Sequence, residues 1–192
     1  MKIVLIPGHS VKEQGAVVCA GPYEGISEYE LARSYLPDVG AELSRLGFEV
    51  VYTTREAAGG SSPRCSARAA NATRADVALE FHFNSFAGTA SGAEVLYWRS
   101  SAPGGRFAAA LSARLAACLG VPDRGGKPIS TPRDRGYRAF RDSRMPFFML
   151  EPCFAGSEPG DAEQLGSLLS TGTWAREVAA AIAEALDIAG FR

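Results

Sequence analysis

The sequence predicts an α/β fold: a single domain with a mostly parallel, twisted sheet and helices on both faces. Short apolar runs alternate along the chain with segments whose apolar residues recur at helical spacing, which is typical of strands joined by crossover helices. The runs are rich in β-branched and large apolar residues, as strands buried on both faces are. The chain has 192 residues, 46% of them hydrophobic, which is enough for one sizeable core. Because there are no repeats and no second zone of composition, we expect one domain over residues 1–192.

The amino-terminal part begins with an apolar run, residues 2–6, that we expect to be the first strand. A Gly-rich loop then leads to Ser27 and Glu30, which match a capping box and predict the start of a helix. The helix continues with apolar residues at four-residue spacing: Leu31, Tyr35, Val39 and Leu43. Pro37 lies inside this stripe, so the helix should be kinked or broken in two. The run at 48–53 predicts the second strand.

The rest of the chain continues the alternation. A proline after a small Gly/Ser-rich loop predicts a helix over residues 63–74, and strands are expected at 77–81 and 92–98. A third helix follows on an apolar stripe: Phe107, Leu111, Leu115 and Leu119. Residues 120–144 contain Gly, Pro and many charges and are expected to form a loop. A strand at 146–150 follows, and the last helix has its own stripe: Trp174, Val178, Ile182 and Leu186.

Composition and charge argue against several classes of protein. The formal net charge is −1, from 20 Lys and Arg against 21 Asp and Glu, whereas a nucleic-acid-binding protein usually has a basic surface. No apolar run approaches the length of a membrane span. The first apolar stretch is too short for a signal peptide, and no small-residue cleavage site follows it. We therefore expect neither nucleic acid nor a membrane span, and we expect synthesis in the cytoplasm.

Three polar residues follow three of the expected strands directly. His9 comes after the first strand through a Pro-Gly turn, His82 ends the run at 77–81, and Glu151 ends the run at 146–150. If these strands are parallel neighbours, the three side chains meet at the carboxyl edge of the sheet, where open α/β sheets bind ligands. His9 and His82 are the only histidines in the chain. Two imidazoles beside a carboxylate predict a catalytic metal at this edge, and zinc suits that donor set best.

A set of motifs carries a family resemblance. In chain order they are Ile6-Pro7-Gly8-His9, Glu28 at a helix start, Ala70-Asn71 with Ala75-Asp76, His82-Phe83-Asn84 and Glu151-Pro152-Cys153-Phe154. The ordered set resembles the zinc-dependent N-acetylmuramoyl-L-alanine amidases of bacterial autolysins and phage endolysins, and it spans nearly the whole chain. The resemblance implies one catalytic domain that hydrolyses the amide bond between N-acetylmuramic acid and L-alanine in peptidoglycan, for lysis or remodelling of the cell wall.

Carried over by position, the resemblance implies that His9, Glu28 and His82 bind Zn²⁺ and that Glu151 is the catalytic acid/base. Arg141 matches an arginine that often precedes the last strand in this family, so it is expected to be catalytic as well. The chemistry agrees with this division. A bound zinc ion lowers the pKa of water from ~15.7 to about 7. With both histidines used as ligands, a carboxylate must carry the proton, and Glu151 is the carboxylate at the sheet edge.

Three acidic residues compete for the carboxylate ligand. Glu30 is occupied if the capping box forms, and Glu24 lies in a loop from which it could swing in. Glu28 is preferred because it lies at the first position of a rigid helix. The chain also departs from the family pattern: Glu80-Phe81 stands where Ser-Ile is more common, Ser85 where Ala is common, and Pro152-Cys153 where Leu-Gly is usual. These departures concern fine substrate preference more than the reaction.

Other functions fit parts of the same pattern. A zinc peptidase could use this site on wall peptides, and a non-catalytic wall-binding module could keep the fold, although a retained Glu151 argues against the module. A thiol hydrolase using Cys153 would lack the motif expected around such a nucleophile.

Basic residues gather in one stretch: Arg124, Lys127, Arg133, Arg135, Arg138, Arg141 and Arg144. They predict either a cationic rim for the peptide carboxylates of the wall or a solvated loop. Because peptidoglycan lies outside the cytoplasmic membrane, we expect an enzyme that, if Met1 is its native start, is made in the cytoplasm and acts on the cell wall after release. The alternative is a longer native protein in which a signal or targeting segment precedes Met1.

Overall fold

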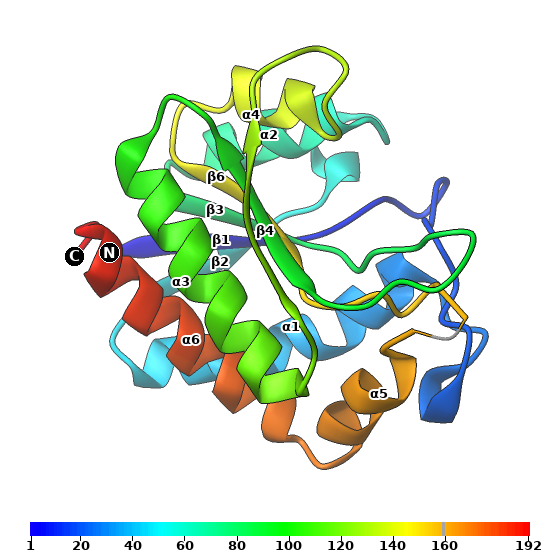
Figure 1. Ribbon diagram of the computed structural model, residues 1–192. Helices are drawn as coiled ribbons and strands as arrows, with labels where there is room; N and C mark the ends of the chain where they lie inside the picture. Colours follow the sequence, from blue (N-terminus) through cyan, green and yellow to red (C-terminus); the bar gives the residue numbers. More distant parts are fainter. Residues whose placement is uncertain (159) are drawn as a thin grey trace.

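One six-stranded sheet forms the centre of the computed structural model, which describes residues 1–158 and 160–192. The strands are β1 (Lys2–Pro7), β2 (Glu49–Tyr52), β3 (Val77–Phe81), β4 (Ala93–Trp98), β5 (Asp123–Ile129) and β6 (Phe147–Glu151). Their order across the sheet is β2-β1-β3-β6-β4-β5 (Figure 1). The first four in this order are parallel, β4 pairs antiparallel with β6, and β5 pairs parallel with β4. As neighbours in the parallel part, β1, β3 and β6 end at the same edge.

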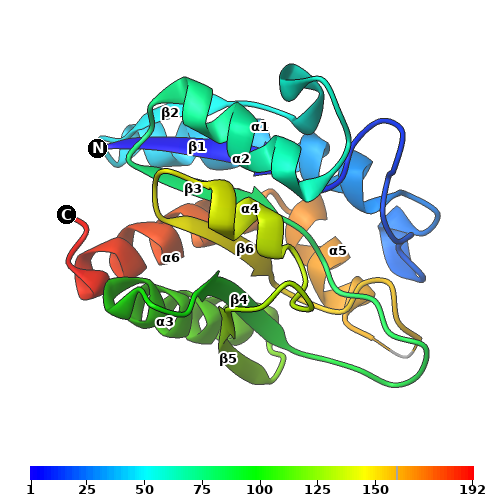
Figure 2. The ribbon, with the colours of Figure 1, turned by 90° about the horizontal axis from the view of Figure 1, so that it is seen from above.

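Helices cover both faces of the sheet (Figures 1 and 2). They are α1 (Glu28–Arg45), α2 (Pro63–Thr73), α3 (Ala102–Leu119), α4 (Tyr137–Asp142), α5 (Ala162–Ser170) and α6 (Thr173–Ala189). Helix α6 packs between α1 and α3 on one face, while α2 packs against α4 on the other. Two short 3-10 turns, η1 (Gly21–Tyr23) and η2 (Arg55–Ala58), lie in loops at the carboxyl edge.

The two layers bury separate apolar cores. The larger core lies between the sheet and α1, α3 and α6, and it contains Trp174 and Phe107. The smaller core lies under α2 and α4 and contains Ile6 and Met149. Glu80 is in register with both Ile6 and Met149, so its side chain shares their face of the sheet. Strand residues alternate between the two faces of the sheet. His82 and Glu151 follow Glu80 and Met149 by two positions, so their side chains project to the same face at the edge of the sheet.

The predicted fold class is confirmed: one α/β domain with a mostly parallel sheet and helices on both faces. The prediction of a loop over residues 120–144 is wrong, since this segment contains both β5 and α4. Strand β5 has the sequence DRGGKPI, which shows no apolar alternation because it lies at the edge of the sheet and only its last residue, Ile129, is buried. Helix α5 is a further element that the sequence did not predict.

The predicted capping box holds, but the helix does not break at its proline. The Ser27 side chain caps α1 by accepting a hydrogen bond from the Glu30 backbone N–H. Helix α1 continues from Glu28 to Arg45 through Pro37, whose side chain is on the exposed side. Among the described residues, no helix combines the length and the apolar character needed to cross a membrane.

Candidate active site and metal centre

The carboxyl ends of β1, β3 and β6 open into a cavity at the edge of the sheet. The residues that line it come from these strand ends, from α1 and from the loops over α2 and α4: His9, Glu28, Arg55, Pro63, His82, Phe83, Asn84, Ser85, Arg135, Gly136, Met149 and Glu151. The two histidines and Glu151, expected from the sequence at this edge, therefore share one cavity. Glu28 reaches the same cavity because α1 begins at this edge.

Three of these side chains form a group that could hold a metal ion. The candidate ligand atoms of His9, Glu28 and His82 all lie within 4.8 Å of one another. Glu28 Oε2 lies 3.1 Å from His9 Nε2, and Glu28 Oε1 lies 2.6 Å from His82 Nδ1. Glu28 and His82 are buried, whereas the His9 side chain is 28% exposed, so the group opens toward solvent on the His9 side. Two imidazole nitrogens and one carboxylate, with one open side, fit a catalytic zinc ion.

The backbone around this group leaves little room for larger residues. A Cβ atom on Gly8 would lie 2.5 Å from His82 Nδ1. Gly15 has a φ of +81°, and a Cβ there would lie 2.7 Å from Glu28 Oε2. His9 itself has a φ of 66°, an uncommon conformation for a residue other than glycine. Such strained positions concentrate at functional sites, where the surrounding structure holds them.

Of the three acidic residues considered from the sequence, the structure brings only Glu28 into the group. Glu30 is occupied as predicted, because its carboxylate accepts a hydrogen bond from the Ser27 hydroxyl at 2.9 Å. Glu24 is exposed in the loop before α1. Glu28 is held from two sides, since the Phe83 backbone N–H donates to Oε1 at 3.1 Å and the Ala16 backbone N–H donates to Oε2 at 3.3 Å. These bonds fix the carboxylate between the two histidines.

The charges in this group are strongly coupled. Burial acts to raise the pKa of Glu28, but the hydrogen bonds with His82 and His9 outweigh it and lower the pKa to about 2. For His82, burial acts to lower the pKa, while the carboxylates of Glu28 and Glu80 raise it to about 10. The free site thus favours a protonated His82 next to an ionised Glu28. A metal that binds a neutral imidazole must displace that proton.

Glu151 lies in the same cavity and is almost completely buried. Its Oε1 is 3.2 Å from a guanidinium nitrogen of Arg135, while its Oε2 has no hydrogen-bond partner among the described residues. Burial raises the pKa of Glu151 to about 7; His82 and Arg135 oppose the rise, and Glu28 and Glu94 add to it. A carboxyl group with a pKa near neutrality can both accept and return a proton, which suits a general acid/base.

Arg135 is the basic residue that the structure places next to Glu151. Its guanidinium also lies 2.7 Å from Glu94 Oε1 and donates a hydrogen bond to Asn84 Oδ1. Glu94 on β4 is directly opposite Glu151 in the antiparallel register, so one arginine bridges the two carboxylates. The sequence had included Arg135 only as one of several basic residues in the stretch 124–144. Asn84 is buried within this network.

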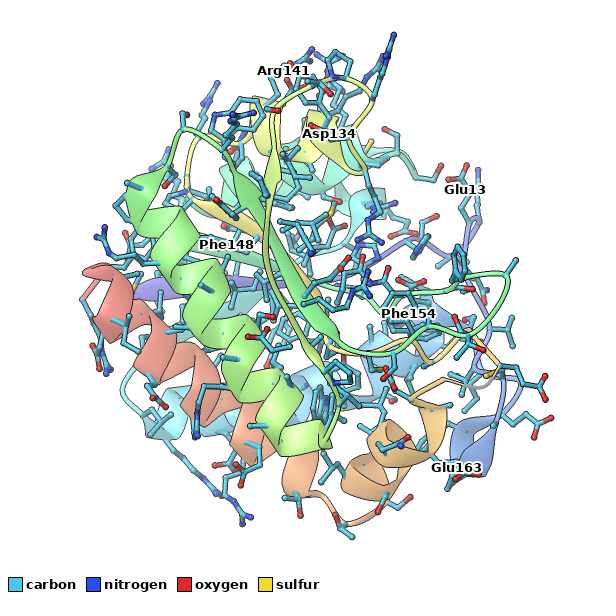
Figure 3. All side chains as sticks on the ribbon, in the orientation of Figure 1. Glu13, Asp134, Arg141, Phe148, Phe154 and Glu163 are labelled. Carbon is cyan, nitrogen blue, oxygen red and sulfur yellow. The ribbon has the colours of Figure 1, made fainter. Side chains whose placement is uncertain are left out.

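Arg141 is not among the residues that line this cavity, and its catalytic role stays a prediction. Arg141 is in the last turn of α4, and only four residues separate this helix from the amino end of β6, whereas Glu151 is at the carboxyl end. Its guanidinium pairs with Asp142 at 2.6 Å and lies over the ring of Tyr137. Figure 3 shows Arg141 by α4 at the top of the molecule, apart from the loop with Glu13 that follows β1.

A second buried network lies directly behind His82 and was missed as a functional feature. Glu80, on β3, is fully buried, and its Oε1 accepts hydrogen bonds from Arg55 Nη2 at 2.9 Å and from the Ser66 hydroxyl at 2.6 Å. Arg55 and Ser66 are themselves buried. The signal was available in the sequence, because a glutamate inside an apolar strand needs a partner, but the identity of that partner depends on the loop after β2.

The fold and the cavity together define a class. An α/β sheet whose carboxyl edge holds a His-Glu-His group and a separate buried glutamate is an arrangement typical of metal-dependent hydrolases. The chain belongs to the N-acetylmuramoyl-L-alanine amidase family, whose model matches residues 3–187. This match confirms the resemblance seen in the motifs. A search of curated proteins finds no match.

Solved structures share the fold. Cwp6 from Clostridium difficile has a TM-score of 0.79 and 18% identity, with 96% of this chain and 29% of that chain covered. The catalytic domain of CwlV, an N-acetylmuramoyl-L-alanine amidase from Bacillus (Paenibacillus) polymyxa var. colistinus, has a TM-score of 0.73 and 23% identity, with 97% and 98% covered. The amidase AmiC2 of Nostoc punctiforme has a TM-score of 0.73 and 22% identity, with 100% and 98% covered. This chain spans less than a third of Cwp6 and nearly all of the other two.

Proposed function

We propose that this chain hydrolyses the amide bond between N-acetylmuramic acid and L-alanine in peptidoglycan, and that it does so with zinc held by His9, Glu28 and His82. The observation that carries the proposal is the convergence of these three side chains, with ligand atoms within 4.8 Å of one another, in a cavity shared with Glu151. The family to which the chain belongs supports the choice of bond.

In this proposal, zinc, Glu151 and Arg135 have different roles in the hydrolysis. When bound, zinc supplies a Lewis acid that polarises the amide carbonyl and lowers the pKa of water. Glu151 takes the proton of the attacking water on its unpartnered Oε2 and returns it to the leaving amine, for which its raised pKa is suited. Arg135 keeps Glu151 in place through Oε1 and leaves Oε2 without a hydrogen-bond partner among the described residues. Here Arg135 is the arginine next to Glu151, and a catalytic role for Arg141 stays a prediction.

The alternatives are less well supported. A thiol hydrolase would need a reactive thiol, but Cys153 is fully buried, and burial raises its pKa well above the usual range. A wall-binding module without catalysis would have no use for a buried carboxyl group that lines the cavity and has one oxygen without a hydrogen-bond partner in the described part of the chain. A zinc peptidase would use the same site on a different bond of the wall. That the enzyme is made in the cytoplasm and released to the wall stays a prediction.

Product analysis tests both the bond and the metal. Purified peptidoglycan is digested with the protein freed of metal by a chelator, and again after zinc is added, and the products are identified by mass spectrometry. We expect zinc-dependent release of intact stem peptides that begin with a free L-alanine. Peptides cut internally would favour the peptidase instead, and full activity of protein shown to contain no metal would refute the role of zinc.

A further inference from the structure

The carboxylate of Glu80 is held in an unusual way, because all its donors converge on one oxygen. Arg55 donates to Oε1 from Nε at 3.2 Å and from Nη2 at 2.9 Å, and the Ser66 hydroxyl donates to the same atom at 2.6 Å. An arginine that only neutralises a carboxylate commonly forms a fork with both oxygens. Here the second oxygen, Oε2, is buried and has no hydrogen-bond partner in the described part of the chain.

That second oxygen faces His82. Glu80 and His82 are two residues apart on the same strand and its extension, so their side chains project to the same side of the sheet. Oε2 of Glu80 lies 3.7 Å from Nε2 of His82, an ionic contact longer than a hydrogen bond. The Nε2 atom is likewise buried without another partner among residues 1–158 and 160–192. The two orphaned atoms thus face each other.

The orientation of the ring gives this contact a consequence. His82 turns Nδ1 toward Glu28 and the metal group, and Nε2 toward Glu80. An imidazole that binds a metal through Nδ1 must be neutral and must carry its proton on Nε2. A carboxylate opposite Nε2 attracts the N–H there and repels a bare lone pair. The same arrangement, an acceptor behind a ligand histidine, fixes the ring and its tautomer in many metal sites.

We propose that Glu80, held by the buried cation of Arg55, is a positioning residue that keeps the ring proton of His82 on Nε2 and thereby directs Nδ1 to the metal. The inference rests on the proposed metal-dependent function, and it assigns a role to a residue that is not itself a metal ligand. It also explains one difference between this chain and the family pattern, namely Glu80 at the position where serine is more common.

The variant Glu80→Gln makes the sharpest test, because its geometry is dictated by the surrounding donors. The guanidinium of Arg55 can only donate at the Oε1 position, where it places two nitrogens, so the amide oxygen of the glutamine must take that place. The amide NH₂ group then faces His82 Nε2 as a donor and favours the wrong tautomer. The matched control is Ser66→Ala, which removes a bond to the same oxygen but leaves the charge opposite His82.

The first measurement is the zinc dissociation constant of the full chain, by competition with a chelator. We expect Glu80→Gln to weaken zinc binding roughly 10- to 100-fold, the scale for losing such a partner of a ligand histidine, and Ser66→Ala to change it less than about twofold. The second measurement is the ¹⁵N spectrum of histidine in the zinc-loaded protein, which shows only two rings. The Nε2–H of His82 should be protected from exchange in the unchanged protein and in Ser66→Ala, and exposed to exchange in Glu80→Gln.

The outcomes separate this inference from the proposed function. Equal zinc affinity in Glu80→Gln and the unchanged protein, with an unaltered His82 signal, would overturn the role of Glu80 and leave the zinc site intact. Equal losses in Glu80→Gln and Ser66→Ala would reduce Glu80 to a structural residue. Failure of the unchanged protein to bind zinc would instead refute the proposed function. If Glu80→Gln does not fold, Glu80→Asp retains the charge but withdraws it, and it should weaken zinc binding several-fold; no change there would also overturn the inference.

Discussion

Glu80 and Glu151 lie on neighbouring strands of one sheet, both buried and both paired with an arginine, yet their acidities differ widely. Burial raises the pKa of each carboxyl group. For Glu80, Arg55 together with His82 and Ser66 outweighs burial and lowers the pKa to about 2. For Glu151, the opposing charges of His82 and Arg135 do not outweigh burial, and the pKa rises to about 7.

The two pKa values differ because the two arginines differ in burial and in the number of carboxylates that each contacts. Arg55 is 4% exposed and pairs with one carboxylate, Glu80, its other donor contacts being to Ser66 and the Ser61 carbonyl, whereas Arg135 is 48% exposed and is shared between two carboxylates, Glu151 and Glu94. Glu151 also has two carboxylates acting on it, Glu28 and Glu94. Under the proposed function, the same residue type would therefore be a fixed charge behind the metal-binding side chains at one position and a proton carrier in the cavity at the other.

The largest expected effect comes from removing the proton carrier. Glu151→Gln keeps the size and most contacts of the side chain, so the protein should fold and bind zinc, but turnover should fall by roughly two to four orders of magnitude, the usual scale for a general base. Rates of peptidoglycan hydrolysis and zinc content measure this. Glu163→Gln, at an exposed position of α5, is the control and should behave as the unchanged protein. Turnover of Glu151→Gln within about threefold of normal would show that another group carries the proton.

The next largest effect is expected on stability, because Glu80 is a buried charge that needs its cation. Arg55→Ala leaves Glu80 buried without its cation, and breaking a buried ion pair in this way typically costs about 3–5 kcal/mol. Arg135→Ala removes an arginine that is half exposed, so its cost should stay within about 1 kcal/mol. Unfolding of both variants in urea measures the two free energies. Equal losses in the free energy of unfolding would mean that the buried Arg55–Glu80 pair stabilises the protein no more than the more exposed Arg135–Glu151 pair.

The pH dependence of activity tests the other pair, Glu151 with Arg135. A base must be ionised to accept a proton, so kcat/KM should rise with pH through the pKa of Glu151. Arg135→Met removes a nearby positive charge, which makes ionisation harder and should shift this rise to higher pH by about one unit, the low end for loss of an adjacent opposite charge. Arg138→Met, an exposed position of the same segment, should leave the profile in place. A shift toward lower pH would contradict the pairing of Arg135 with Glu151.

How much of this could be predicted from the sequence depends on how each feature is encoded. Strands β1, β3 and β6 are continuous apolar runs, so both their existence and the polar residues at their ends were predicted. Strand β5 was missed because an exposed edge strand has no such run. Helix α1 was predicted from its cap, but Pro37 does not break it, because packing of the apolar face outweighs a local preference.

The candidate site also contains residues that local sequence predicts and residues that it does not. His9 and His82 follow directly from strand ends, while Glu28 and Arg141 were placed by family spacing. The structure brings Glu28 into the cavity and leaves Arg141 outside its lining, with Arg135 next to Glu151 instead. The reason is the turn before α4, where Asp134 accepts hydrogen bonds from the backbone N–H groups of Ser130 and Thr131. This turn directs the next residue, Arg135, toward the cavity, and a path of this kind is not visible in residue spacing.

The smaller expected effect on stability at Glu80 separates its two partners. Ser66→Ala removes two hydrogen bonds, the one that the hydroxyl donates to Oε1 and the one that it accepts from Arg55 Nε, while both nitrogens of Arg55 keep their contacts with Oε1. We expect a loss of about 2 kcal/mol in the free energy of unfolding, the net value of two hydrogen bonds, which is less than for Arg55→Ala. The same urea experiment measures it. A loss as large as that of Arg55→Ala would mean that the hydroxyl, and not the buried cation, keeps Glu80 ionised, and the contrast with Glu151 would then rest on hydrogen bonding instead of charge.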